Sequence, residues 1–120
     1  MITSKYFKEA EFQRCSPSCS LQEMSQAFIN RLDATREAAG IPLLLSSAYR
    51  SAAWDKAKGR SGKGDHPQGM GADIVCRSSD TRMKILRAAF EVGWTRIGIG
   101  DTFIHLGMGA DLPDNVVWLY

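Results

Sequence analysis

Residues 64–76 read GDHPQGMGADIVC, and they place His66 seven residues before Asp73, which lies in an apolar run. Gly69 and Gly71 lie between the two, so the chain can bend there and bring both side chains to one point. The run over residues 72–76 is typical of a buried strand. A carboxylate is costly to bury in such a strand unless it is paired or binds a metal, so Asp73 is expected to have a partner.

The only other histidine of the chain, His105, lies in the same setting, between Ile104 and Leu106. Two imidazoles and one carboxylate form a set that zinc accepts tetrahedrally at roughly 2.0 to 2.2 Å, with the fourth position left for water. An open position is typical of a catalytic site. The spacing alone also fits a protein without a metal, in which His66 caps a loop, Asp73 caps a turn and His105 is a hydrogen-bonded core residue.

Turn and capping signals divide the rest of the chain into short elements. Residues 20–23 have the form of a capping box and predict a helix over residues 21–39, ended by Gly40 and Pro42. A short helix is expected over residues 51–58. A further helix is expected from Asp80 as its N-cap to Gly93. Its apolar stripe is predicted to consist of Met83, Leu86 and Phe90.

Strands are predicted over residues 42–50, 72–76, 96–100, 103–106 and 116–120. Together these elements indicate an α+β fold, with helices packed on a small, largely antiparallel sheet. At 120 residues with 44% apolar composition, the chain has the size of one compact domain, residues 1–120.

Charge and hydropathy exclude several classes of protein. The net charge of +2 comes from 15 basic and 13 acidic residues with no block of one sign, which argues against nucleic acid as a partner. No stretch approaches the roughly 18 apolar residues of a membrane span. Residues 1–11 lack the basic start and apolar run of a secretory signal, so we expect the protein to stay in the cytoplasm until it is released to the cell wall, or to be associated with a virion.

The three cysteines are an odd number, and Cys15 and Cys19 flank a Ser-Pro-Ser turn. The pair fits a disulfide, half of a metal site or two buried thiols. Because no second closely spaced Cys or His pair accompanies them, structural thiols are the favoured interpretation.

Three segments in the same order resemble one known family. Residues 64–73 look like the signature SxHxxGxAxD, residues 47–51 (SAYRS) match S-[AG]-Y-R-[ST], and residues 98–105 match G-[IV]-G followed by F-[IV]-H. These segments are similar to those of zinc D-alanyl-D-alanine carboxypeptidases, dipeptidases and phage L-alanyl-D-glutamate endopeptidases (endolysins). The resemblance runs from about Tyr6 to Tyr120, as in compact phage and prophage members, and implies the zinc peptidase fold that this family shares with hedgehog proteins.

The resemblance implies that His66, Asp73 and His105 hold Zn²⁺ and that Arg50 binds the substrate carbonyl or carboxylate. It also implies hydrolysis of an amide bond in the stem peptide of bacterial peptidoglycan, by a D,D-carboxypeptidase or an endopeptidase. The chemistry is consistent with this activity, because a fixed guanidinium stabilises a developing oxyanion and zinc lowers the pKa of water toward about 7. Outside this context, a salt bridge at the surface is the ordinary role of an arginine such as Arg50. Trp54, just after Arg50, is expected to form a wall of the cleft.

The chain departs from the family pattern at several positions. The signature's Ser is Gly64 and its first Ala is Gly71. Close relatives have an acid two residues after the last ligand, where this chain has Gly107. Other branches have one three residues before that ligand, where this chain has Thr102.

Peptide hydrolysis by zinc normally needs a general base and an acid, and the family's acid is missing. Asp101 is the candidate we select for this role, provided that the hairpin folds it back over the metal. Asp65, on a mobile loop, is a second candidate, whereas Asp111 and Asp114 are expected in a surface loop. The alternative function is a catalytically impaired module that binds the cell wall or is structural and retains the zinc-peptidase fold.

Overall fold

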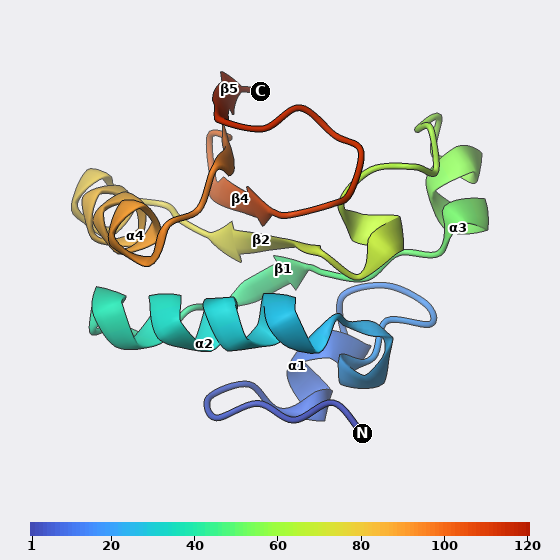
Figure 1. Cartoon of the computed structure of the whole chain (residues 1–120), viewed down its shortest axis with the longest axis horizontal. Coiled ribbons are helices and arrows are strands. Elements are labelled where there is room, and N and C mark those ends of the chain that lie inside the picture. Colours follow the sequence, from blue (N-terminus) through green and yellow to red (C-terminus); the bar gives the residue numbers. More distant parts are fainter.

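The computed structural model describes residues 1–120 and has an α+β architecture built on one five-stranded sheet (Figure 1). The predicted fold class is confirmed. The helices are α1 (Glu9–Gln13), α2 (Gln26–Ala39), α3 (Ala52–Ala57) and α4 (Ser79–Val92), with 3-10 turns η1 (Leu21–Glu23) and η2 (His66–Gln68). The strands are β1 (Leu45–Ser47), β2 (Gly71–Val75), β3 (Arg96–Ile99), β4 (Phe103–Gly107) and β5 (Val116–Leu119).

The strand order is β1-β2-β4-β3-β5, and only the pairing of β3 with β5 is parallel. Asp73 of β2 lies opposite His105 of β4, which in turn lies opposite Gly98 of β3, and Gly98 pairs with Trp118 of β5. Side chains of paired residues point to the same face of a sheet. This row of residues therefore lies on one face, and Gly98 leaves space within it.

The other face of the sheet carries the core. Its alternating residues are fully or almost fully buried, as are the residues of α2 and α4 that pack with them. Figure 1 shows α2 along one side of the sheet and the segment after β4 looping out on the side away from α2. The buried sheet and helix residues are Ala72, Ile74, Ile97, Ile104 and Leu106, with Phe28, Ile29, Leu32, Ile85 and Ala89.

The predicted start of the second helix is wrong by five residues. Ser20 caps only the 3-10 turn η1, because Met24 has extended backbone angles that interrupt the helix. Ser25 then acts as a new N-cap and accepts a hydrogen bond from the backbone N–H of Phe28. The predicted end is confirmed, since Gly40 follows Ala39 in the left-handed conformation.

The predicted cap of α4 is also wrong, and so are two of the three residues of its predicted apolar stripe, whereas Leu86 packs against the core. Ser78, and not Asp80, is the N-cap, and Asp80 lies in the first turn, where its charge favours the helix dipole. Met83 and Phe90 are exposed, whereas Ile85 and Ala89 face α2 and the sheet. A small residue such as Ala89 allows α4 to pack closely against α2, and a pattern of large apolar side chains does not reveal it.

The predicted short helix at residues 51–58 and the last four strands are confirmed within about two residues at each end, the usual precision of element bounds. The first strand is much shorter than predicted, with only Leu45–Ser47 paired. All three cysteines are free thiols. No helix is long and apolar enough to cross a membrane.

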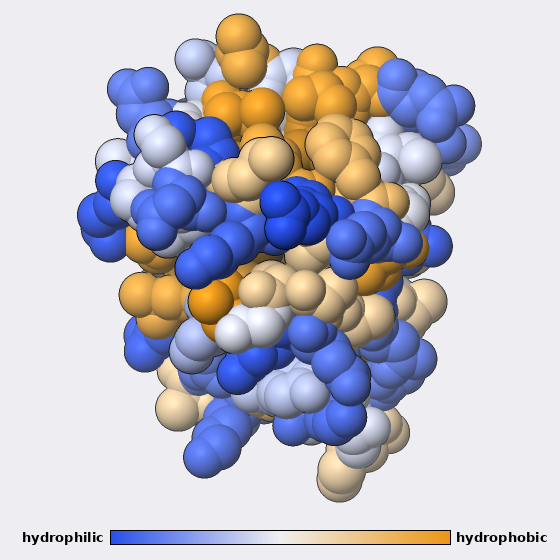
Figure 2. All heavy atoms as spheres, turned by 90° about the vertical axis from the view of Figure 1, so that its left-hand side faces the viewer, coloured by the Kyte–Doolittle hydropathy of each residue, from blue (hydrophilic) through white to orange (hydrophobic).

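Apolar residues are also exposed at one end of the molecule. Figure 2, viewed from the α4 side, shows apolar side chains gathered at the top of the molecule, over β5. Val117, Leu119 and Tyr120 are the large exposed apolar residues of this terminal segment.

We expect Thr35→Val to lower the free energy of unfolding by about 1 to 3 kcal/mol, the cost of leaving a buried donor unsatisfied. The Thr35 hydroxyl is fully buried, donates to the carbonyl of Arg31, and accepts from the indole Nε1 of Trp94 at 2.7 Å. Urea unfolding measures the change, with Thr102→Val at an exposed site as the isosteric control. Equal effects of the two substitutions would contradict this account of the α2 contact.

Candidate metal centre

His66, Asp73 and His105 meet on the polar face of the sheet. One donor atom from each lies within 4.8 Å of the other two. Nε2 of His66 is 3.4 Å, and Nδ1 of His105 is 2.8 Å, from Oδ1 of Asp73. The structure thus brings together the three residues that the sequence singled out, from η2, β2 and β4.

The η2 turn and the end of β1 set the orientation of His66. Its Nδ1 lies 2.6 Å from the carbonyl of Ala48, to which the N–H of this nitrogen donates. That hydrogen bond leaves Nε2 as the nitrogen with a free lone pair, directed at Asp73. The backbone of Arg50 also donates to the carbonyl of His66, so the SAYRS segment holds the first ligand by its main chain.

His105 is oriented in the same way by a carboxylate. Its Nε2 lies 2.7 Å from Oδ2 of Asp65, while Nδ1 faces Asp73. When Nε2–H donates to Asp65, Nδ1 is left as the metal-binding nitrogen. The contribution of Ala48 and Asp65 is to fix one tautomer at each histidine.

The donor types, two imidazoles and one carboxylate, fit zinc. Tetrahedral bonds of 2.0 to 2.1 Å place neighbouring donor atoms about 3.3 Å apart, close to the separation of His66 and Asp73. The shorter separation of Asp73 and His105 would open by a few tenths of an ångström. Both imidazoles are buried, and each has its second nitrogen hydrogen-bonded, as metal-binding histidines usually do.

Asp65, which the sequence placed on a mobile loop, has a buried side chain held by several hydrogen bonds. Its side chain is 3% exposed, and its two oxygens accept from Nε and Nη2 of Arg96 at 3.2 and 3.0 Å, as well as from His105. The backbone N–H of Gly109 donates to it at 2.8 Å. All of its close neighbours are donors, so Asp65 has no free lone pair directed at the face of His105 that bears Nδ1.

Burial and hydrogen bonds compete in setting the pKa values at this site. Burial alone raises the pKa of Asp65, but hydrogen bonds from His105, Arg96 and Gly109 outweigh it and hold that pKa well below its usual range. Burial likewise raises the pKa of Asp73, and the two histidines reverse the effect. The pKa of His105 is lowered by burial but raised further by Asp65 and Asp73, with a net rise above its ordinary value. Both carboxylates are therefore ionised at neutral pH.

His66 and His105 line a cleft of about 250 Å³ whose walls also include three arginines and two aspartates. Arg50 lines it, held by Asp55 at 2.9 Å from Nε and by the hydroxyl of Ser47 at 3.2 Å from Nη1. Nη2 of Arg50 has no hydrogen bond within the protein, and its buried Nε is ion-paired with Asp55 without forming a hydrogen bond. The predicted substrate-binding arginine thus keeps a free donor beside both histidines.

The aromatic wall of the cleft consists of Trp118 and Tyr120, whereas the sequence favoured Trp54 over Trp118 and did not point to Tyr120. The ring of Trp118 lies 5.5 Å from that of His105, across the space left by Gly98. Trp54, predicted for this wall, is not among the lining residues and instead lies under the ammonium of Lys58. The parallel pairing of β5 with β3 brings the C-terminal aromatics to the site, and no local signal in the sequence reveals it.

Arg96 is a further residue of the site that the sequence pattern did not point to. It begins β3, is 9% exposed and forms the ion pair with Asp65. A charged residue that opens an apolar strand needs a buried partner, the same signal that singled out Asp73.

The structure does not bring Asp101 to the three ligands. Asp101 is exposed in the tight turn between β3 and β4, and its side chain makes no hydrogen bond. The hairpin register places this turn beyond the pair Val75 and Phe103, so it does not fold back over the metal ligands. Asp111 and Asp114 are exposed as predicted, and none of these three residues lines the cleft.

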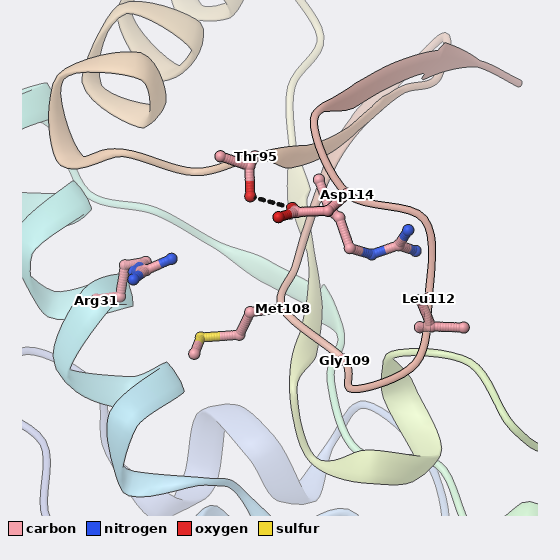
Figure 3. Close-up of a pocket in the computed structure, with 7 residues that line it drawn as sticks. Arg31, Thr95, Met108, Gly109, Leu112 and Asp114 are labelled. Atoms are coloured by element: carbon pink, nitrogen blue, oxygen red, sulfur yellow. Dashed lines mark hydrogen bonds between the residues drawn. The ribbon is translucent and has the colours of Figure 1, made fainter.

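A second hollow of about 280 Å³ lies beside the cleft and shares Arg96 and Leu112 with it. Figure 3 shows its wall, where the hydroxyl of Thr95 donates to the carboxylate of Asp114 and ties the segment before β5 to the start of β3. Nη1 of Arg96 also donates to the carbonyl of Pro113. These contacts hold the 108–115 segment against the back of the Asp65 site.

Three comparisons with known proteins bear on this site. A sequence model of the family described as peptidase M15 matches residues 5–107. The crystal structure of the L-Ala D-Glu endopeptidase ChiX from Serratia marcescens is similar in fold, with a TM-score of 0.54, 16% sequence identity, and coverage of 87% of this chain and 91% of that chain. No curated protein sequence matches the chain significantly.

We expect zinc affinity to fall as the pH falls, because zinc binds only neutral imidazole. The pKa of metal-free His105 lies above its ordinary value of 6.5, so below that raised pKa a proton occupies the site. The loss should begin at a higher pH than for an ordinary histidine and approach about tenfold per pH unit for each proton displaced. Competition with a chromophoric chelator between pH 5.5 and 8 measures it, and an affinity that is independent of pH would contradict the proposed ligands.

Asp101→Asn should change hydrolysis of a peptide substrate by no more than about twofold, as expected of an exposed side chain without partners. Turnover and bound zinc are measured for the same samples. A large loss of turnover with zinc retained would restore to Asp101 the role predicted from the sequence.

Proposed function

Because the chain belongs to the peptidase M15 family, we propose that it is a zinc-dependent peptidase that hydrolyses an amide bond in the stem peptide of bacterial peptidoglycan. The observation that carries the proposal is the arrangement of His66, Asp73 and His105. Each histidine has one nitrogen held by an acceptor and the other directed at Asp73. Three protein ligands and an open fourth position are typical of catalytic zinc.

Hydrolysis adds water across the amide, with OH going to the carbonyl carbon and the proton to the leaving amine. Zinc, when bound, supplies Lewis-acid chemistry that makes water nucleophilic near neutral pH. The free Nη2 of Arg50 donates to the substrate oxygen and stabilises the negative charge that develops there. The Asp55 carboxylate and the Ser47 hydroxyl hold the guanidinium in place for this task.

The charge of the cleft suits the proposed substrate. Arg50, Arg60 and Arg96 line it, against Asp55 and Asp65. Asp65 neutralises Arg96, and Asp55 is closer to Arg50 than to Arg60, from which it is 3.9 Å away. Arg60 and Nη2 of Arg50 are therefore the groups that can bind the carboxylates of a stem peptide.

The bond that is cut is proposed from the structural relative. ChiX is an L-Ala D-Glu endopeptidase with a similar fold, which makes the L-alanyl-D-glutamate bond the first to test. Removal of the terminal D-alanine is the other activity that this site would support. Mass spectrometry of digested muropeptides distinguishes the two by the fragment released.

The alternative function is a module that retains the fold and binds the cell wall without turnover. The observation that favours it is the absence of a free carboxylate beside the ligands, since Asp65 and Asp55 are both engaged and position 107 is glycine. Zinc binding and retention on peptidoglycan without any released fragment would support this alternative.

His66→Ala should abolish both stoichiometric zinc and peptidoglycan hydrolysis, because it removes a metal ligand. Arg50→Gln should keep zinc but lower turnover by about 10² to 10³, the effect of losing one donor to a developing oxyanion. Elemental analysis and fragment release measure the two properties. Arg77→Gln, at an exposed arginine outside the cleft, is the matched control.

Chelation followed by addition of Zn²⁺ should remove and restore the activity of the unmodified chain. A protein that binds no zinc would contradict the proposal. Zinc without cleavage of any stem peptide would support the binding module in its place.

A further inference from the structure

We infer that Asp65 supplies, from a new position in the chain, the carboxylate that close relatives carry two residues after the last metal ligand, and that it acts as a positioning residue for His105. The inference rests on the proposed zinc site, and it goes further by assigning a role to the departures from the family pattern. Asp65 lies immediately before the first ligand, yet its carboxylate contacts the last one.

Three glycines around Asp65 leave the space that its side chain occupies. A Cβ at position 107 would overlap Oδ2 of Asp65, and one at position 71 would come within 2.6 Å of its Cβ. A Cβ at position 109 would lie 2.7 Å from Oδ1, and the backbone N–H of Gly109 donates to the same oxygen. Side chains at these three positions are therefore incompatible with Asp65 in its observed place.

Two of these glycines are departures from the family pattern. Gly71 stands where the signature has alanine, and Gly107 stands where close relatives have the acid. The two are opposite each other in the pairing of β2 with β4. The loss of a side chain at both positions opens the space that the Asp65 carboxylate fills, so the two departures and Asp65 form one arrangement.

The Asp65 carboxylate also lies where an aspartate at position 107 would begin. An aspartate at position 107 would start from a Cβ that overlaps Oδ2 of Asp65, on the same face of β4 as His105. Because Oδ2 of Asp65 is 2.7 Å from Nε2 of His105, a side chain that starts beside Oδ2 is long enough to bring a carboxylate oxygen to the same nitrogen in a suitable rotamer. The same group is thus present in the site although it comes from a different residue.

The partners of Asp65 define its role. It accepts from Nε2 of His105, which leaves Nδ1 to bind the metal, and its charge is balanced by Arg96. Arg96 in turn lies 5.1 Å from the ring of Trp118 and is tied to the carbonyl of Pro113. With all its close neighbours being donors, Asp65 orients the ligand and is not the group that takes the proton from water.

The test is zinc affinity, measured by chelator competition for Asp65→Ala, Gly107→Asp and the double variant. Loss of a hydrogen-bonded partner of a metal ligand typically costs about 10- to 100-fold in affinity, which is the fall expected for Asp65→Ala. Gly107→Asp alone should also weaken zinc binding, since two carboxylates would compete for one place. The double variant should recover most of the affinity lost by Asp65→Ala.

Asp33→Ala is the matched control. Asp33 is 9% exposed and accepts from Ser4 and from the backbone of Lys5 and Tyr6, on α2 and outside the cleft. Its loss should lower the unfolding temperature and leave zinc affinity unchanged. If the role of Asp65 were purely structural, Asp65→Ala would likewise lower the unfolding temperature and leave zinc affinity unchanged. Gly107→Asp would then restore neither property in the double variant.

Zinc affinity of Asp65→Ala equal to that of the unmodified chain would overturn the inference, and so would a double variant no better than Asp65→Ala. If Asp65→Ala does not fold, recovery of a folded, zinc-binding double variant gives the same support, and its failure to fold overturns the inference. Because affinity is measured without substrate, the two proposals fail separately. A chain that shows these affinities but cleaves no stem peptide loses only the proposed function, and one that cleaves while Asp65→Ala binds normally loses only the role of Asp65.

Discussion

The antiparallel pairing of β2 with β4 places Asp73 opposite His105, and the rest of the metal centre depends on this register. A slip of one residue would move Asp73 to the core face and bring Ile74 to the polar one, because side chains alternate along a strand. The buried residues of both strands prevent that slip because they belong to the core cluster on the other face, which also contains residues of α2 and α4. The apolar core therefore fixes the positions of two of the three metal ligands.

The third ligand comes from outside the sheet and is held by main-chain contacts. Its η2 turn ends at Gly69 in the left-handed conformation, where a Cβ would overlap the carbonyl of Glu23. The carbonyl of Ala48 then sets the ring of His66. Backbone acceptors of this kind are rigid, so the donor atoms are preorganised before a metal arrives, and less of the binding free energy is spent on ordering them.

The charges of the site are buried as a network and not as isolated pairs. Asp65 is shared between Arg96 and His105, and Asp73 between the two histidines. Removing one member of such a network leaves an uncompensated buried charge, which typically costs about 3 to 5 kcal/mol. Membership of the peptidase M15 family confirms the resemblance seen in the three motifs, while the glycines around Asp65 show how this chain differs in detail from the family pattern.

The sequence by itself determined the fold class, the positions of the last four strands along the chain and the three candidate ligands, because periodicity, caps and the cost of burying Asp73 and His105 are local properties. It could not assign the face of α4, the start of α2 or the wall formed by Trp118, since these follow from packing between distant segments. It placed Asp65 on a mobile loop and Asp101 near the metal, because distance along the chain says little about distance in space. Only the tertiary structure decided that a carboxylate beside the first ligand reaches the last one, since that contact requires the space left by glycines on two other strands.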